Sequence, residues 1–209
     1  MRVLMVFDHP YGIDASENVP HHRSFSAALA AAARRGLEKA GHEVDIIDLH
    51  ADGFNPVMSA QDLTEWRGKT STDPQILDYQ KRLLAADHLM FVFPVWWELM
   101  PASTKGFIDK VIAKGIAYEQ SSGGKSFGSK LPNLQGVTLI TVMSTPDVIY
   151  RAWFGNPLLK AMFRGTFRKI GVRNLRWMNH AGVEGKTPEA RAKILARTEA
   201  RFAAMRTHS

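Results

Sequence analysis

The sequence predicts an α/β protein, a three-layer sandwich with a five-stranded parallel sheet between two layers of helices. Short apolar runs typical of strands alternate with longer helical patterns along all 209 residues. No repeat or low-complexity linker divides the chain, and 45% hydrophobic residues suffice for one sizeable core. Parallel strands need crossover helices that cover both faces of the sheet, so we expect a single domain over residues 1–209.

Two strands and two helices are expected in the first part of the chain. They are a strand over residues 2–7, a helix over 24–40, a strand over 44–49 and a helix over 73–85. Gly41 is a suitable residue to end the first helix, because glycine adopts the left-handed conformation without cost. Asp73 followed by Pro74 is typical of a helix start, where the carboxylate caps free N–H groups.

The rest of the chain continues the alternation. The expected elements are a strand over residues 88–93, a helix over 101–114, a strand over 137–143, a helix over 157–170, a strand over 172–178 and a helix that begins at 187. Residues 121–129 are polar and glycine-rich, and we interpret them as a mobile loop.

Composition excludes several kinds of chemistry. The chain has no cysteine, which rules out disulfides, thiolate metal sites, iron–sulfur clusters and a cysteine nucleophile, so any redox function must come from a bound cofactor. The longest apolar runs, such as 89–97, are far shorter than the roughly 20 residues of a membrane span. We expect a cytoplasmic protein with no signal peptide and no integral membrane segment.

The net charge of +7 arises in the last part of the chain. Up to Tyr150 there are 14 basic and 17 acidic residues, whereas residues 151–209 hold 13 basic and 3 acidic ones. A basic face can bind nucleic acid, but these residues are interspersed in a helical pattern without a zinc-finger spacing or a string of RNA-binding aromatics. We expect a solvated basic face or contacts to a phosphate-bearing cofactor, and no nucleic-acid partner.

Ligands of parallel α/β sheets bind beyond the carboxyl ends of the strands, which places function in residues 8–26, 94–101 and 144–155. The first segment lacks Gly-x-Gly-x-x-Gly, which argues against a Rossmann dinucleotide site. Gly124-Lys125-Ser126 imitates the end of a P-loop, but the first glycine of that motif would fall at Glu119.

Hydroxyl groups stand where the first helix should begin. Ser24-Phe25-Ser26 follows His9 and a polar insertion, and free N–H groups at a helix start favour an anion such as phosphate or pyrophosphate. Plain N-capping by Ser24 or Ser26 explains the same residues equally well.

Two adjacent tryptophans, Trp96 and Trp97, follow a strand that reads as buried. Successive residues of a strand face opposite sides, so at least one indole should line a ligand site or an interface. Packing of both rings in the core or between two copies of the chain is the alternative.

Several motifs in order give the chain a family resemblance. They are His9-Pro10, Ser24-Phe25-Ser26, Gly41-His42-Glu43-Val44, Asp48-Leu49, Phe54-Asn55-Pro56, Ala85-Ala86-Asp87 and, most specific of all, the run from Phe93 to Val111. Together they resemble the flavodoxin-like NAD(P)H:quinone oxidoreductases, which include quinone reductase, the modulators of drug activity and the ancillary reductases of potassium efflux systems. The resemblance covers most of residues 3–150.

The resemblance implies a flavodoxin-like flavin-binding domain and a homodimer with active sites at the subunit interface. It implies two-electron reduction of quinones or related acceptors by NAD(P)H in a ping-pong sequence, with no metal. FAD is the first choice of cofactor, because Phe25, Phe54 and Pro56 resemble the FAD-binding members, and FMN is the alternative. The residues assigned to the cofactor are His9, Ser24, Phe25, Ser26, Pro94, Val95, Trp96, Trp97, Glu98, Thr141, Met143 and Ser144.

Two residues are candidates for a direct part in the reaction. Trp97 would supply an apolar wall that excludes water. Tyr150 falls near the family's active-site tyrosine, whose hydroxyl can hydrogen-bond a developing quinone oxyanion, although a packed tyrosine at a helix start fits as well. The companion histidine of the family has no clear match, and His180 is the nearest residue by topology.

The chain departs from the family at two places. Many members carry Thr-Thr-Gly-Gly where this sequence has Thr141-Val142-Met143-Ser144, and residues 11–23 form a longer insertion than the family has. The insertion is interpreted as a flexible exposed segment or a lid over the cofactor, and its paired histidines do not have metal-ligand spacing.

Several functions stay open at this point. The same site could reduce azo or nitro compounds, the flavin could serve a non-catalytic regulatory subunit of a membrane transporter, or the basic face could bind nucleic acid. Four arginines of the basic region could receive cofactor phosphates, namely Arg151, Arg164, Arg168 and Arg173.

Overall fold

Five parallel strands form one central sheet, which confirms the predicted fold class. The computed structural model describes residues 1–17, 24–121 and 126–206. The strand order is β2-β1-β3-β6-β7, and every neighbouring pair is parallel. The strands are β1 (Arg2–Phe7), β2 (Glu43–Asp48), β3 (His88–Pro94), β6 (Gly136–Met143) and β7 (Asn174–Ala181).

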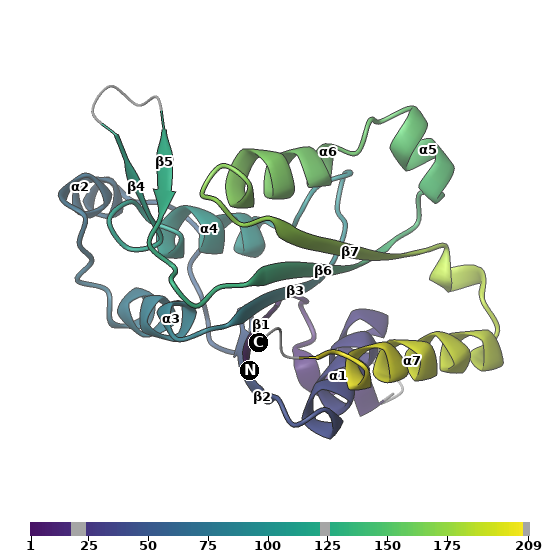
Figure 1. The fold of residues 1–209 in the computed structure, drawn as a ribbon. Coiled ribbons are helices and arrows are strands. Elements are labelled where there is room, and N and C mark those ends of the chain that lie inside the picture. The colour runs from purple at the N-terminus through teal and green to yellow at the C-terminus, as the bar shows by residue number, and fades with distance from the viewer. Residues whose placement is uncertain (18–23, 122–125, 207–209) are drawn as a thin grey trace.

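Helices cover both faces of this sheet (Figure 1). One face packs against α1 (Phe25–Lys39) and α7 (Pro188–Ala203). The other face packs against α3 (Pro74–Leu84), α4 (Ala102–Val111) and α6 (Pro157–Leu159), which continues as a π-helix over Lys160–Phe167. Shorter elements are α2 (Ala60–Gly68), α5 (Asp147–Ala152), 3₁₀ turns at Ile13–Glu17 and Val183–Gly185, and a hairpin of β4 (Tyr118–Gln120) and β5 (Phe127–Ser129).

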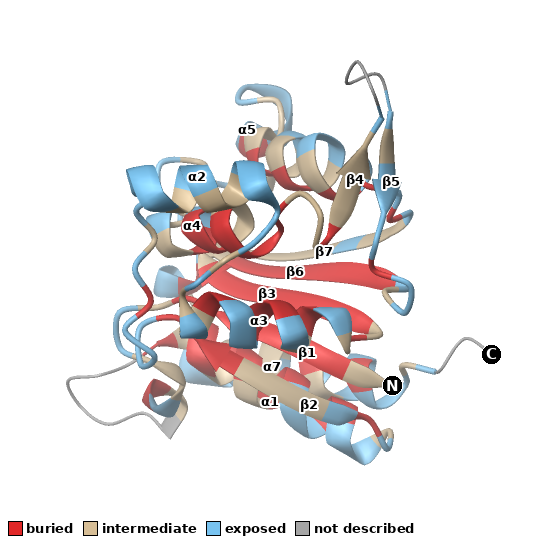
Figure 2. Cartoon of the chain, turned by 90° about the vertical axis from the view of Figure 1, so that its left-hand side faces the viewer, coloured by how far each residue is buried: buried red, intermediate tan, exposed pale blue. Residues whose placement is uncertain are grey.

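The central strands are buried on both sides, as the red strands in Figure 2 show. Along β3, Leu89, Phe91 and Phe93 contribute to the core under α3 and α4, while Met90 and Val92 contribute to the core under α1. This near-continuous apolar run is what a parallel strand covered on both faces requires. No helix in the described part of the chain is long and apolar enough to cross a membrane.

Two segments differ from the sequence-based expectations. The last strand lies at 174–181 instead of 172–178, because Gly171 turns the chain with φ +99° and Asn174 is the first residue to pair with β6. Residues 127–129 pair with 118–120 in a hairpin, so 121–129 is not wholly a loop. Residues 122–125 lie outside the described part of the chain.

Two helices were not expected, and each has a local reason. In α2 the first turn is a capping box, in which Ser59 and Asp62 satisfy each other's backbone N–H groups, but the helix has no buried residue and hence no apolar periodicity to detect. In α5 only Tyr150 is buried, so the six residues carry too little pattern to predict a helix.

We expect acidification to destabilise the protein through His88. Its ring is buried beside Thr138, and burial, with smaller contributions from Arg176 and His42, lowers the pKa of His88 to about 4. The unfolded chain takes up this proton near its ordinary pKa of 6.5, so between pH 6.5 and 4 the unfolded state binds more protons. The free energy of unfolding should therefore fall by up to about 1.4 kcal/mol per pH unit in this window.

Urea unfolding at pH 7.5, 6 and 5 measures this dependence on pH. A His88→Gln variant keeps a hydrogen-bonding group next to Thr138 but does not titrate, and should show a flatter profile. The same slope in both proteins would assign the effect to other groups.

Candidate active site at the carboxyl edge of the sheet

The segments that follow β1, β3 and β6 lie side by side at one edge of the sheet. The Asp8 N–H donates to the Val92 carbonyl at 3.0 Å, and the Val95 N–H donates to the Val142 carbonyl at 2.8 Å. These bonds continue the parallel ladders beyond the strand ends. The first two predicted ligand segments thus meet the third at this edge.

A buried carboxylate joins β1 to the helix that follows β3. Asp8 is 1% exposed, and its Oδ2 accepts hydrogen bonds of 2.7 Å from both the N–H and the hydroxyl of Thr104. Its Oδ1 lies 3.1 Å from Nε2 of His50. Asp8 therefore fixes the first turn of α4, and with it the position of the preceding tryptophan segment. No sequence motif pointed to this residue.

His9 is held in its neutral form with a defined tautomer. The Tyr11 N–H donates to Nδ1 of His9 at 3.1 Å, which leaves the hydrogen of the neutral ring on Nε2. Burial, and next to it the neighbouring His50, lower the pKa of His9 below its usual range. His9 can therefore donate from Nε2 to an anion without carrying a charge.

At the start of α1 the structure shows the N-cap that Ser24-Phe25-Ser26 predicted and leaves two N–H groups open beside it. The hydroxyl of Ser24 accepts from the Ala27 N–H at 3.1 Å, so Ser24 is the N-cap. Among the described residues, the N–H groups of Phe25 and Ser26 have no acceptor. These two donors, reinforced by the helix dipole, can bind an anion.

Trp96 to Leu99 form a tight and strained turn. Trp96 and Leu99 exchange backbone hydrogen bonds of 2.9 and 3.0 Å, and the two residues between them, Trp97 and Glu98, have φ of +47° and +64°. This is the type I′ geometry that normally takes Asn and Gly, because other side chains cost about 1–2 kcal/mol there. The Trp97 and Glu98 N–H groups have no acceptor in the described part of the chain. Trp97 is 96% exposed.

Glu98 and Tyr150 tie this turn to the third segment. Oε1 of Glu98 accepts from the Thr145 hydroxyl at 2.7 Å, and its Oε2 is buried with no partner in the described structure. The Tyr150 hydroxyl donates to the Glu98 carbonyl at 2.9 Å and accepts from the Leu158 N–H at 3.1 Å. Burial raises the pKa of Tyr150. For the catalytic role predicted for Tyr150, its hydroxyl would have to give up the hydrogen bond to the Glu98 carbonyl and donate to the quinone oxygen instead.

The other predicted cofactor residues divide between the core and the edge. The Thr141 hydroxyl is buried, donating to Asn179 and accepting from Trp177, and Met143 belongs to the core. Their contacts with a cofactor would have to come from the backbone. Pro94 and Val95 are half-buried at the end of β3, whereas Ser144 is exposed at the edge.

A pocket of about 390 Å³ lies next to the start of α1. It is lined by Ser144, Asp147, His180 and Lys186, and the ring of His180 meets that of Phe25 edge-on at 6.5 Å. Nε2 of His180 is buried without a partner in the described structure, and burial lowers the pKa of His180. Asp147 and Lys186 were missed because nothing in the local sequence places them near Phe25.

Most of the arginines proposed for cofactor phosphates lie elsewhere. The guanidinium of Arg151 stacks over the Trp177 ring at 4.9 Å, and Arg164 and Arg168 belong to the helical layer opposite α1. Arg173 is exposed in the turn before β7. The basic excess of the C-terminal part is therefore mostly a solvated surface, and of its lysines and arginines between residues 151 and 206 only Lys186 lines the pocket beside α1.

Exposed apolar side chains surround the strained turn. The most exposed are Trp97 at 96%, Trp153 at 84% and Val148 at 76%. Trp96, Leu99, Ile149 and Phe154 are also exposed, and all belong to the turn or to α5 and its end. An apolar surface of this kind marks a ligand or protein interface.

Comparison with known proteins identifies the family. The sequence model described as the flavodoxin-like fold matches residues 1–205. The chain belongs to this family. Within it, an uncharacterized NAD(P)H oxidoreductase of Haemophilus influenzae is 29% identical over 176 residues, which are 84% of this chain and 81% of the relative.

Two further proteins show how far the similarity extends. NAD(P)H dehydrogenase [quinone] 1 of Rattus norvegicus is 36% identical over 111 residues, which are 46% of this chain and only 40% of the rat protein. The crystal structure of Smu.1420 from Streptococcus mutans has a TM-score of 0.81 at 25% identity and covers 98% of this chain and 100% of that one. In the described part of this chain, no three metal-ligating side chains lie close enough together to hold a metal ion.

Proposed function

We propose that this protein is an NAD(P)H-dependent flavin oxidoreductase that transfers two electrons to quinones or related acceptors. One observation carries the proposal: the open N–H groups at the start of α1 share a sheet edge with the strained Trp96–Leu99 turn. An anion site beside an exposed planar indole suits a cofactor with phosphate groups and a planar ring system. The names of the Haemophilus and rat relatives support the same class.

The residues at this edge fit a flavin. The N–H groups of Phe25 and Ser26, with Nε2 of His9, would hold its phosphate. Pro94, Val95 and the two tryptophans would border its ring system. When bound, the flavin supplies the redox chemistry, accepting hydride from NAD(P)H and passing two electrons on.

The protein's own part in the reaction is electrostatic and steric. The Trp97 and Glu98 N–H groups have no acceptor among the described residues, so they would be free to stabilise negative charge on the reduced ring. The Trp97 indole would exclude water from one face. Tyr150 and Thr145 would hold the turn in place through Glu98.

We propose FAD rather than FMN as the cofactor. Phe54 and Pro56, which suggested FAD in the sequence, face inward instead: Phe54 packs on Tyr79, and Pro56 contacts α4 at Gly106. Support for FAD comes from the 390 Å³ pocket beside Phe25, which has room for an adenylate. Lys186 in its lining can pair with the negative charge of the adenylate phosphate. FMN would leave this pocket without a ligand.

We propose that the chain forms a homodimer through the apolar surface around Trp97 and Trp153. Two rings that are 96% and 84% exposed are costly in water, and a second copy would cover them together with the flavin ring. The cytoplasmic location stays a prediction from the sequence.

Absorption spectroscopy tests the proposed function directly. The purified protein, or the flavin-free protein titrated with FAD and FMN, should show flavin bands that NADPH bleaches and a naphthoquinone restores. A protein that binds neither flavin would overturn the proposal. If NADPH bleaches the bands but no acceptor restores them faster than oxygen does, the non-catalytic regulatory subunit would be favoured. If only azo or nitro compounds restore them, the acceptors would be of that class and not quinones.

A substitution at the start of α1 locates the cofactor. Ser26 is buried in the first turn of α1, and Ser26→Val replaces its hydroxyl by two methyl groups next to its own open N–H, so FAD affinity should fall at least tenfold; the added volume should cost about 1–3 kcal/mol in unfolding, so affinity is measured where the variant is folded. Thr64→Val, on the exposed helix α2, is the matched loss of a hydroxyl and should leave FAD affinity unchanged. Equal affinity in both variants would place the phosphate elsewhere.

A further inference from the structure

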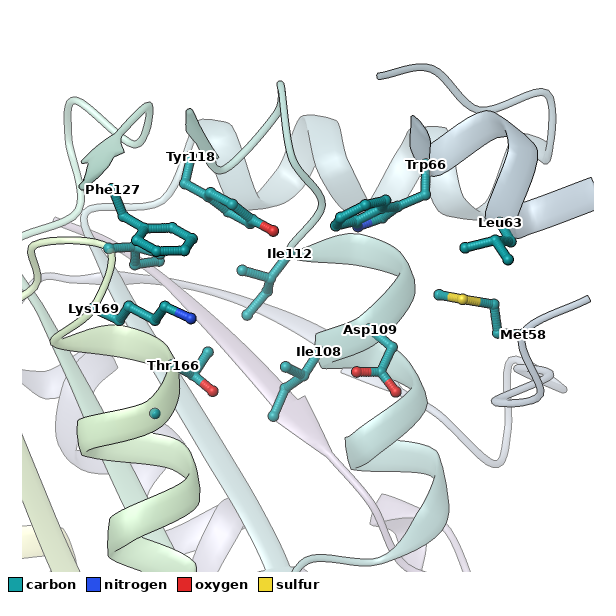
Figure 3. A pocket seen from close by; sticks show the side chains of 12 residues that line it. Met58, Leu63, Trp66, Ile108, Asp109, Ile112, Tyr118, Phe127, Thr166 and Lys169 are labelled. Atoms are coloured by element: carbon teal, nitrogen blue, oxygen red, sulfur yellow. The ribbon is translucent and has the colours of Figure 1, made fainter. Parts of the chain in front are cut away.

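A polar pocket of about 240 Å³ lies at the amino edge of the sheet, where β3, β6 and β7 begin. Because all five strands are parallel, this edge is opposite to the carboxyl edge. Figure 3 shows a larger pocket, of about 460 Å³, whose walls are mainly aromatic and aliphatic and where Lys169 lies over the Phe127 ring. The lining of the amino-edge pocket is different in kind, and its polar side chains are His88, Gln135, Asn174, Arg176, Arg201 and Arg206.

The alternation of strand residues turns these side chains toward α7. Met178 of β7 packs in the core under α1 and α7, so Arg176, two residues earlier, lies on the same face of the sheet. His88 of β3 shares this face with Met90. The last turn of α7 brings Arg201 to the same pocket. The sheet and the helix that covers it thus each supply a cation.

Two contacts hold the wall of the amino-edge pocket. The Met205 carbonyl accepts a hydrogen bond from Nε2 of His42 at 2.9 Å, which anchors the chain just before Arg206. The side chain of Asn174 lies against Gly136, where a Cβ atom would come within 2.9 Å of its Nδ2. Glycine at this position therefore leaves room for an amide donor in the wall.

Three arginines around this pocket have no acidic partner. Among the described residues, Arg176, Arg201 and Arg206 form no salt bridge, and no aspartate or glutamate lines the pocket. Burial and, next to it, the charge of Arg176 lower the pKa of His88, so this positive charge acts inside the pocket. Like charges gathered around one pocket repel each other, which favours an anion that binds between them.

We propose that the amino-edge pocket binds a compact polyanion with two or more negative charges, such as pyrophosphate or a tricarboxylate. Each planar guanidinium can bond two oxygens of a phosphate or carboxylate group, and the amides of Gln135 and Asn174 add donors. A single negative charge would leave most of the positive charge of the three arginines uncompensated. The volume lies below the roughly 300–1,000 Å³ of sites for larger ligands, which favours a compact anion over a whole nucleotide. This site lies at the opposite edge from the proposed flavin and does not depend on it.

Calorimetry of the purified protein with its flavin bound tests the proposal with pyrophosphate, citrate and acetate. At low ionic strength, pyrophosphate or citrate should bind at least about tenfold more tightly than acetate. Arg176→Gln and Arg201→Gln should each weaken the polyanion by about tenfold or more, and both positions are exposed, so the variants should fold. Arg67→Gln, which removes an exposed arginine of α2, is the matched control and should bind as the wild type does.

The titrations can overturn the proposal in three ways. These are binding of neither polyanion, acetate binding as tightly as the polyanions, and unchanged polyanion affinity in both arginine variants. An equal loss in Arg67→Gln would assign the effect to net charge and would also contradict a specific site. If the site exists, the tighter of the two polyanions shows whether it is built for phosphate or for carboxylate groups.

NMR spectra locate the bound anion. The side-chain amide signals of Gln135 and Asn174 should shift when pyrophosphate is added, whereas the amide of Asn55, which bonds to the Val57 N–H, should not. Shifts confined to residues of the carboxyl edge would place the anion at the proposed flavin site and overturn the proposal.

Thermal unfolding gives a second readout and checks that each variant is folded. A ligand that binds only the native state stabilises it, so pyrophosphate should raise the melting temperature of the wild type more than that of Arg176→Gln. Flavin affinity should be the same in all of these variants. A protein that takes up no flavin would overturn the proposed function and leave the anion titrations valid, so the two failures are distinguishable.

Discussion

Replacing Trp97 by glycine should make the apo protein more stable and the enzyme much less active. Trp97 has φ +47° and an almost fully exposed indole, so the wild-type fold gains little from the ring and bears the cost of a left-handed backbone. Glycine relieves that cost, and we expect about 1 kcal/mol of added stability in urea unfolding of the flavin-free protein. Loss of the indole should lower quinone reduction and flavin affinity at least tenfold, as for an aromatic anchor of a binding site.

Trp97→Ala is the control that separates the backbone from the ring. Alanine removes the indole but keeps a Cβ in the left-handed conformation, so it should match glycine in lost activity and show no gain in stability. If both variants keep full activity and flavin affinity, Trp97 is not a wall of the site. If glycine lowers stability, the turn is not strained as its dihedral angles indicate.

Asp8→Ala should be strongly destabilising. The substitution leaves two buried donors without their acceptor, the N–H and the hydroxyl of Thr104, and it removes the contact to the exposed ring of His50. Breaking a buried polar network of this kind costs about 3 kcal/mol, which for a chain of this size lowers the melting temperature by roughly 6–12 °C. Because Thr104 lies in the first turn of the helix after the tryptophan turn, flavin affinity should fall as well.

Two control variants show whether the loss of stability in Asp8→Ala comes from the buried hydrogen bonds. Asp8→Asn keeps the shape: its carbonyl oxygen can accept from Thr104, and its amide can donate to His50 in the other tautomer, so we expect a loss of about 1 kcal/mol. Asp14→Ala removes an exposed carboxylate of the same loop and should change stability by less than about 0.5 kcal/mol. A loss in Asp14→Ala as large as in Asp8→Ala would point to net charge instead of the buried network.

The arrangement of the sheet was predictable from the sequence because each strand and helix is marked by a pattern of neighbouring residues, and these patterns alternate along the chain. Five apolar runs separated by helical segments allow few topologies once crossovers must be right-handed and both faces covered. The strands fell where expected to within a few residues, and the ligand segments follow from the rule that parallel strands end at one edge. The caps Ser24, Asp73 and Thr187 were also visible, because capping depends on neighbours in the chain.

Tertiary contacts decided the chemistry within that frame. Asp8 bonds to Thr104 across 96 residues, and Lys169 contacts Phe127 across 42 residues, separations at which sequence spacing carries no information. The left-handed pair Trp97 and Glu98 departs from the residues that a type I′ turn prefers, and the bonds that Thr145 and Tyr150 donate to Glu98 add tertiary support to the turn. The sequence by itself thus determined the sheet, its layers and the edge where ligands bind. The tertiary structure decided which polar groups at that edge are satisfied and which remain open, because hydrogen-bond partners and burial depend on residues far apart in the chain.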